Sequence, residues 1–120
     1  MTIETLVTRP DTQDRETFAW GEITWVDSGT LTASDSLTVG RVTINAGASN
    51  PEHRHPNCEE ALYLLEGELD HWIGEERVHL TTGDCLHIPV GKPHRARNTG
   101  DEPAIAVIAY DTGSRGFEPV

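Results

Sequence analysis

Short apolar runs recur along this chain, and most carry the two-residue alternation or the β-branched content of strands. No helical period persists beyond two turns. Gly and Pro supply turn residues roughly every ten positions, a spacing typical of an all-β sandwich or barrel. The run Ala104–Tyr110 is apolar throughout, so we expect it in the centre of a sheet. The other expected strands are Trp20–Val26, Leu37–Asn45, Ala61–Leu65, Cys85–Ile88 and a hairpin of Glu68–Ile73 with Glu75–Leu80.

The two ends of the chain lack this pattern. Residues 1–18 are polar and charged, which predicts an arm that is ordered only by packing on something else. Residues 19–112 make the predicted barrel, and residues 113–120, with Gly113, Gly116 and Pro119, make a predicted loose tail. A chain of 120 residues has room for one core and not for two, so we expect a single domain.

One stretch combines imidazole and carboxylate side chains at short spacing. His53 and His55 are one residue apart, so on an extended strand both imidazoles leave the same face, about 7 Å apart along the strand. Glu60 follows a short turn at the head of Ala61–Leu65, which is expected to return alongside the first strand. Its neighbour Glu59 is expected on the opposite face, although a register shift in the turn would exchange the two glutamates.

His94 comes just past a turn built from Pro89, Gly91 and Pro93, and it is a candidate fourth ligand. Three imidazoles and one carboxylate suit one divalent transition metal ion, namely Mn, Fe, Co, Ni, Cu or Zn. Four protein ligands on an octahedral ion leave two positions for water or substrate. The alternative is a set of barrel histidines that are satisfied by hydrogen bonds.

Two motifs contain these residues and resemble the two signatures of the cupin family, G-x5-H-x-H-x4-E-x6-G and G-x5-P-x-G-x2-H-x3-N. Both match without a departure, fifteen residues lie between them, and the resemblance covers residues 37–110. The matching residues are Gly47, His53, His55, Glu60 and Gly67 in the first motif and Gly83, Pro89, Gly91, His94 and Asn98 in the second.

The resemblance implies a double-stranded β-helix, the jelly-roll barrel of cupins, with the metal ion inside one mouth. It assigns His53, His55, Glu60 and His94 as the metal ligands. It also implies a homodimer in which outer sheet faces, and often an exchanged N-terminal strand, pack together. Tyr63 is expected on the face of its strand opposite to that of Glu60, on the outside of the sheet, which is consistent with such a docking face.

Two further residues are candidates for supporting groups around the metal. Arg41 lies mid-strand and either points into the barrel, where it would anchor a substrate carboxylate or phosphate, or faces solvent, which is the favoured interpretation. His87 stands on the strand of the second motif and is a candidate acid or base lining the cavity. The default for His71, His79 and His87 is a position on the surface or at an interface.

The charge and the cysteine content limit the classes of partner and the compartment that we expect for this protein. Nine basic and 20 acidic residues give a formal net charge of −11, which argues against nucleic acid or an anionic membrane surface as partner. Cys58 and Cys85 are too few for a disulfide scaffold, and we interpret both as free thiols in a reducing cytoplasm. No apolar run approaches the eighteen residues of a membrane span, and no secretion signal is evident.

The leading functional hypothesis is a metal-dependent enzyme that acts on a small, oxygen-rich, anionic molecule by isomerase, lyase or dioxygenase chemistry. Single-domain cupins cover several such activities, and the resemblance selects none of them. The alternative is a non-catalytic module that binds a metal or small molecule. A sensor domain attached to a helix-turn-helix fits poorly, because the barrel uses the available length.

Overall fold

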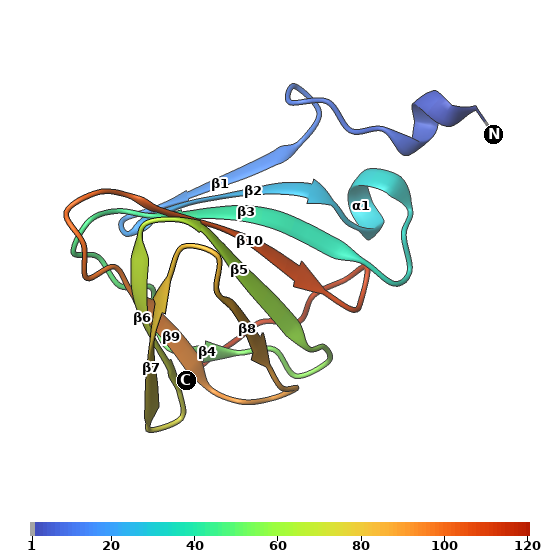
Figure 1. The fold of residues 1–120 in the computed structure, drawn as a ribbon. Coiled ribbons are helices and arrows are strands. Elements are labelled where there is room, and N and C mark those ends of the chain that lie inside the picture. Colours follow the sequence, from blue (N-terminus) through green and yellow to red (C-terminus); the bar gives the residue numbers. More distant parts are fainter. Residues whose placement is uncertain (1) are drawn as a thin grey trace.

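Strands provide most of the regular structure in the computed structural model, which describes residues 2–120 (Figure 1). Two helices of a single turn also occur there, η1 (Ile3–Leu6) and α1 (Gly29–Thr32), and neither has the length or hydropathy to cross a membrane. The strands are β1 (Asp14–Phe18), β2 (Gly21–Asp27), β3 (Thr38–Ile44), β4 (His53–Arg54), β5 (Glu60–Glu66), β6 (Glu68–Ile73), β7 (Glu76–Thr81), β8 (Cys85–Ile88), β9 (His94–Arg97), β10 (Ala104–Tyr110) and β11 (Glu118–Pro119).

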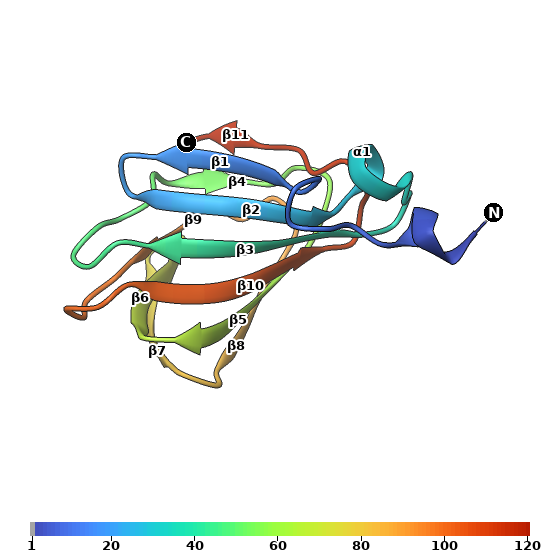
Figure 2. The same cartoon turned by 90° about the horizontal axis from the view of Figure 1, so that it is seen from above.

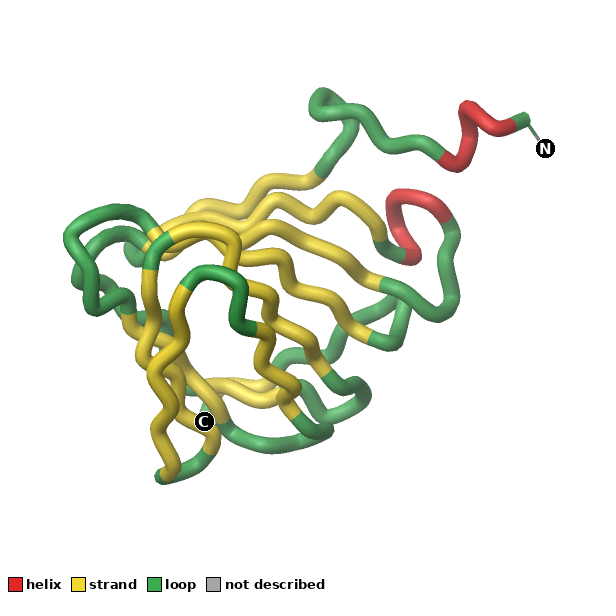
Figure 3. The backbone as a smooth tube through the Cα atoms, viewed as in Figure 1, coloured by secondary structure: helices red, strands yellow, loops and turns green. Residues whose placement is uncertain are grey.

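The described strands form two antiparallel sheets that face each other. One sheet has the order β1-β2-β3-β10-β5-β8 and the other has the order β11-β4-β9-β6-β7. Figure 2 shows β1, β2, β3, β10 and β5 side by side, and Figure 3 shows the strands curling around a common interior. The prediction that Ala104–Tyr110 is a central strand is confirmed, since β10 pairs with β3 on one side and β5 on the other.

The core lies between the sheets and is built by alternation. On β2, β3 and β5 the buried positions alternate with more exposed ones, and the apolar side chains among them are Ile23, Trp25, Val42, Ile44, Leu62 and Leu64. On β10 the inward residues are Ala104, Ala106, Ile108 and Tyr110, so small side chains fill one end and large ones the other. The predicted hairpin of β6 and β7 is confirmed, with Ile73 opposite Glu76 at its turn.

Glycine turns connect the strands where the two motifs predicted them. Gly47, Gly67, Gly83 and Gly91 all have positive φ, between 73° and 95°. At Gly67 a Cβ would also lie 3.0 Å from Cα of Ala104, so backbone conformation and close approach both require glycine. The backbone N–H of Gly91 donates to the carbonyl oxygen of His55 at 2.9 Å, which joins the two motifs.

Both ends of the chain contribute strands. The expected arm pairs in part: β1 forms the edge of the larger sheet against β2, while residues 2–13 extend away from the barrel (Figure 1). The tail differs from the expected loose segment, because β11 pairs with β4 and Arg54 forms an ion pair with Glu118 at 3.3 Å. The segment after β2 forms α1, whose first turn is capped by Ser28.

Candidate metal centre

Strands from both sheets bring the predicted ligands together. His53 on β4 is the register partner of His94 on β9 in the smaller sheet. Glu60 begins β5 in the larger sheet, opposite Tyr110 of β10. His55 lies just past the end of β4, where Pro56 turns the chain towards β5. The candidate centre therefore lies between the two sheets.

The three imidazoles converge in the barrel interior. One ring nitrogen from each of His53, His55 and His94 lies within 4.8 Å of the others, so these residues can hold a single metal ion. All three residues are at most 8% exposed. Their ring centroids are 4.2 to 5.1 Å apart, and the rings are tilted or edge-on to one another.

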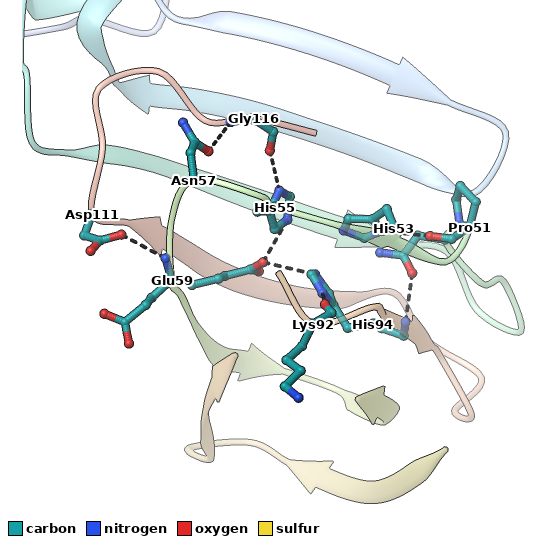
Figure 4. A network of polar contacts seen from close by, with 12 residues as sticks. Pro51, His53, His55, Asn57, Glu59, Lys92, His94, Asp111 and Gly116 are labelled. Carbon is teal, nitrogen blue, oxygen red and sulfur yellow. Dashed lines mark hydrogen bonds and ion pairs between the residues drawn. The ribbon is translucent and has the colours of Figure 1, made fainter. Parts of the chain in front are cut away.

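Backbone carbonyl groups set the tautomer of each imidazole. The Nδ1 atoms of His53, His55 and His94 lie 2.8, 2.8 and 2.9 Å from the backbone oxygens of Pro51, Gly116 and Lys92 (Figure 4). A carbonyl oxygen only accepts, so Nδ1 carries the proton and the neutral ring keeps a lone pair on Nε2. Hydrogen bonds of this kind orient metal-ligating histidines.

Glu60 completes the cluster with a buried carboxylate. Its Oε1 lies 3.2 Å from Nε2 of His55 and 3.3 Å from Nε2 of His94. Among the described residues none of these three atoms has a hydrogen-bond partner. In the tautomers set by Nδ1 the atoms face one another with lone pairs, so the contacts are repulsive unless a positive charge lies between them. A divalent ion supplies that charge, and imidazole with carboxylate suits such an ion, so the residues fit a metal ion.

The surroundings keep the site in the protonation state that a metal requires. Burial and the neighbouring imidazoles lower the pKa of His53 to about 4, so this ring is neutral at pH 7. Burial by itself would raise the pKa of the Glu60 carboxyl, but a positive charge on or between the Nε2 atoms of His55 and His94 outweighs burial and holds the pKa well below its usual range. Metal ligands bind as neutral imidazoles and ionised carboxylates.

A cavity of about 110 Å³ opens beside these ligands. His53, His94 and Glu60 line it together with Tyr110, whose pKa is raised well above its usual value by burial and by the charge of Glu60. Tyr110 is therefore a neutral phenol at pH 7. The rest of the wall is mainly apolar and comes from both sheets, with Ile23, Val42, Ile44, Leu62 and Ile108 as its aliphatic members. Such a wall excludes water around the polar groups.

His71 lines the cavity, whereas the sequence predicted a position on the surface or at an interface. It is 2% exposed, lines the cavity and stacks on His94 with centroids 5.8 Å apart. Its Nδ1 has no hydrogen-bond partner within residues 2–120. Burial and the nearby His94 lower its pKa to about 4. Alternation could have identified it, since His71 shares the inward face of β6 with the buried Leu69.

The two candidate supporting groups face away from the cavity, which agrees with the favoured interpretation of Arg41 and with the default position of His87. Arg41 is exposed because Val42 and Ile44 take the inward face of β3. The side chain of His87 is 63% exposed, and its Nε2 lies 2.8 Å from a carboxylate oxygen of Glu59 on the outside of the sheet. That contact also confirms that Glu59, not Glu60, is the outward glutamate.

The C-terminal tail supplies site residues that no motif indicated. Besides the Gly116 carbonyl, Phe117 stacks on His53 with centroids 5.0 Å apart, and Arg115 lines the cavity. The amide of Asn57 holds this tail by accepting from the Gly116 N–H at 2.7 Å (Figure 4). It also donates to the Ser114 carbonyl at 2.9 Å.

Fold and site together define a small antiparallel barrel with a candidate histidine metal centre between its sheets. The family model described as "Cupin domain" matches residues 40–110. The chain therefore belongs to the cupin family, and the fold expected from the two motifs is confirmed.

Curated relatives and solved structures agree with this assignment. The chain is 36% identical over 70 residues to the tetracenomycin polyketide synthase protein TcmJ of Streptomyces glaucescens, covering 58% of this chain and 47% of that protein. It is 31% identical over 93 residues to germin-like protein subfamily 2 member 1 of Arabidopsis thaliana, covering 68% and 40%. The chain thus spans less than half the length of these relatives.

Among solved structures, the chain is similar to the oxalate decarboxylase of Lactobacillus farciminis in its formate complex. The TM-score is 0.82 at 22% identity, covering 92% of this chain and 34% of that one. A mutant of the Bacillus subtilis oxalate decarboxylase matches with a TM-score of 0.84 at 22% identity, covering 94% and 31%. At this identity the likeness establishes the fold alone.

Proposed function

We propose that this chain is a metal-dependent cupin enzyme that acts on a small, oxygen-rich, anionic molecule. The observation that supports it is the set of buried, unpartnered ligand atoms, Nε2 of His55, Nε2 of His94 and Oε1 of Glu60, which converge beside a cavity. His53 completes the proposed ligand set. The same four residues would hold the ion through three nitrogens and one oxygen.

Residues of this chain would orient the bound molecule. A divalent ion in this position would supply Lewis-acid polarisation of an oxygen atom. Tyr110, as a neutral phenol, and His71, as a neutral imidazole, both line the cavity and can form hydrogen bonds to that molecule. The aliphatic wall keeps water out, which strengthens these interactions.

Metal analysis of variants tests the ligand set. Wild-type protein produced under defined supply of Mn, Fe, Co, Ni, Cu or Zn should retain about one ion per chain. His94→Ala should lose the ion and keep the far-UV circular dichroism of a β protein. His79→Ala is the matched control, because His79 has a side chain that is 47% exposed and pairs with Asp70 outside the cavity. Equal metal content in His94→Ala and His79→Ala would overturn the assignment.

Manganese is the first ion to supply. A solved structure of Bacillus subtilis oxalate decarboxylase with a TM-score of 0.81 concerns Mn(II) centres, and the Lactobacillus farciminis enzyme is described in complex with formate. These facts concern those proteins, and they support small carboxylates as the first candidate substrates here. Turnover of small keto acids, uronates or catechols would establish an enzyme. Metal retention with no turnover in any of them would favour a binding module instead.

The proposal includes a homodimer. Ile3, Leu6 and Val7 on the N-terminal arm are 78%, 57% and 41% exposed, and β1 forms a sheet edge beside them. Apolar side chains on an extended arm are stabilised by packing on a second copy. Light scattering should give the mass of two chains, and a variant lacking residues 2–12 should give the mass of one. A wild-type monomer would contradict the dimer.

A further inference from the structure

Arg115 is a cation in the cavity wall without an acidic partner. It lies on the tail between β10 and β11, is half-buried and lines the cavity next to the candidate ligands. Within residues 2–120 its guanidinium forms neither an ion pair nor a hydrogen bond, although 20 acidic residues are present in the chain. Arg9, Arg15, Arg54 and Arg77 each contact a carboxylate. The other arginines without an ion pair in residues 2–120, namely Arg41, Arg95 and Arg97, do not line this cavity.

Aromatic rings hold the guanidinium in place. Its Cζ lies 4.7 Å from the ring centroid of Trp25, 5.4 Å from that of Tyr110 and 5.5 Å from that of Phe117. Contacts with ring faces position a guanidinium without using its N–H donors. The backbone is fixed as well, because the next residue, Gly116, is bonded to His55 and Asn57. Arg115 is therefore oriented while its donors remain free.

The described charged residues that line the cavity give the N–H donors of Arg115 no partner, so these donors can bind a ligand. Arg115 is the one arginine or lysine among the described residues that line the cavity, and Glu60 is the one carboxylate. Glu60 contacts His55 and His94, so it is not the partner of Arg115. A planar fork of N–H donors matches the two oxygens of a carboxylate.

We propose that Arg115 binds the carboxylate of the substrate and selects small carboxylic acids. This inference rests on the proposed function, since it names the substrate class of the same site. A cavity of about 110 Å³ is well below the roughly 300 Å³ at which pockets for drug-sized ligands begin, so the acid that it takes is small. A carboxylate at Arg115 leaves the rest of the molecule to face the histidine cluster.

The test compares binding and metal content in three proteins. These are the wild type, Arg115→Gln and the control Arg95→Gln, in which the replaced arginine stacks on Trp72 at 3.8 Å and does not line the cavity. Formate, oxalate, glyoxylate and inorganic phosphate are titrated into metal-free and Mn-loaded protein by calorimetry. The Nε–Hε signal of Arg115, assigned by its loss in Arg115→Gln, is followed by NMR in the titrations of metal-free protein.

At least one of the three carboxylates should bind the wild type, shift the Arg115 Nε–Hε signal and bind Arg115→Gln about 10- to 100-fold more weakly. Arg95→Gln should bind it like the wild type, and all three proteins should hold the same amount of metal. Equal affinity in Arg115→Gln, or no carboxylate binding to the wild type, would overturn the role of Arg115. Preferential binding of phosphate would overturn the substrate class. Loss of metal from the wild type would instead count against the proposed function, and the metal-free titration would still decide the role of Arg115.

Discussion

Nδ1 of His55 donates a hydrogen bond of 2.8 Å to the backbone oxygen of Gly116, 61 residues further along the chain. This bond ties the C-terminal tail to the candidate metal centre. It fixes the His55 tautomer that leaves Nε2 available inside the barrel. The tail is therefore a structural part of the centre, and changes in the tail should alter metal affinity.

Gly116→Ala tests this coupling. A Cβ at Gly116 would lie 2.7 Å from Oδ1 of Asn57 and 3.1 Å from the Pro56 ring, so either Asn57 or the tail must shift. Both movements disturb the contacts that hold the Gly116 carbonyl against His55. Loss of an outer hydrogen bond to a metal-ligating histidine typically weakens metal binding by about 10- to 100-fold. We expect a decrease of that size, measured by competition with a fluorescent chelator.

Ser114→Ala is the control for the tail. Its side chain is exposed, and the tail contact at this residue uses its backbone carbonyl, which accepts from Asn57. Metal affinity should therefore match that of the wild type. If Gly116→Ala also bound metal like the wild type, the hydrogen bond from His55 would have no part in ligand orientation.

The substitution Glu60→Gln distinguishes two roles for Glu60, that of a metal ligand and that of a partner in an ion pair with histidine. A glutamine keeps the shape, loses the charge and can donate to Nε2 of His55 or His94. We expect metal affinity to fall by at least about tenfold. At pH 8 the metal-free variant should be at least as stable to urea as the wild type, because a hydrogen bond replaces a contact between lone pairs.

Glu59→Gln is the matched control, since Glu59 faces outward and contacts His87. It should change neither metal affinity nor urea stability by more than about 0.5 kcal/mol. An ion pair between Glu60 and protonated histidines would give the opposite pattern, with unchanged metal content and a large loss of stability in metal-free Glu60→Gln.

The spacing of residues predicted the ligand cluster because short strands leave little freedom. His53, His55 and Glu60 lie within eight residues of one another, and alternation on β5 assigns Glu60 to the inside. Alternation alone did not assign Arg41 to one face, because β3 carries β-branched residues on both faces. The inward face of β3 is identified only by the burial of Val42 and Ile44 in the folded structure.

The tail could not be predicted in this way. Its contacts with His55 and Asn57 use backbone groups of Ser114 and Gly116, which every residue type possesses. No side-chain pattern therefore marks them in the sequence. Arg115 enters the cavity wall only because this backbone is held against β4, so its role depends on tertiary structure.

Asn98 of the second motif should stabilise the fold without binding metal. It is fully buried, its Nδ2 donates to the carbonyls of Ile44 and Glu102, and its Oδ1 accepts from the N–H of Gly100. Asn98→Ala leaves these backbone groups without their partner, so the free energy of unfolding should fall by about 3 to 5 kcal/mol. Urea unfolding measures this, and Asn45→Ala, at an exposed position, should change it little. A comparably small effect of Asn98→Ala would contradict the role assigned to Asn98.

Metal-free protein should lose stability as the pH falls from about 6.5 to 4. The pKa of His53 and that of His71 are lowered from 6.5 to about 4, so in this window the unfolded chain binds protons that the folded chain does not. Each histidine should contribute on the order of 3 kcal/mol to the loss. Urea unfolding at several pH values measures how steeply the free energy of unfolding changes with pH. Between pH 6.5 and 4 this slope should be about halved in His71→Asn, and between pH 7 and 8 it should be the same in both proteins. A stability that is flat from pH 6.5 to 4 would mean that water reaches both rings.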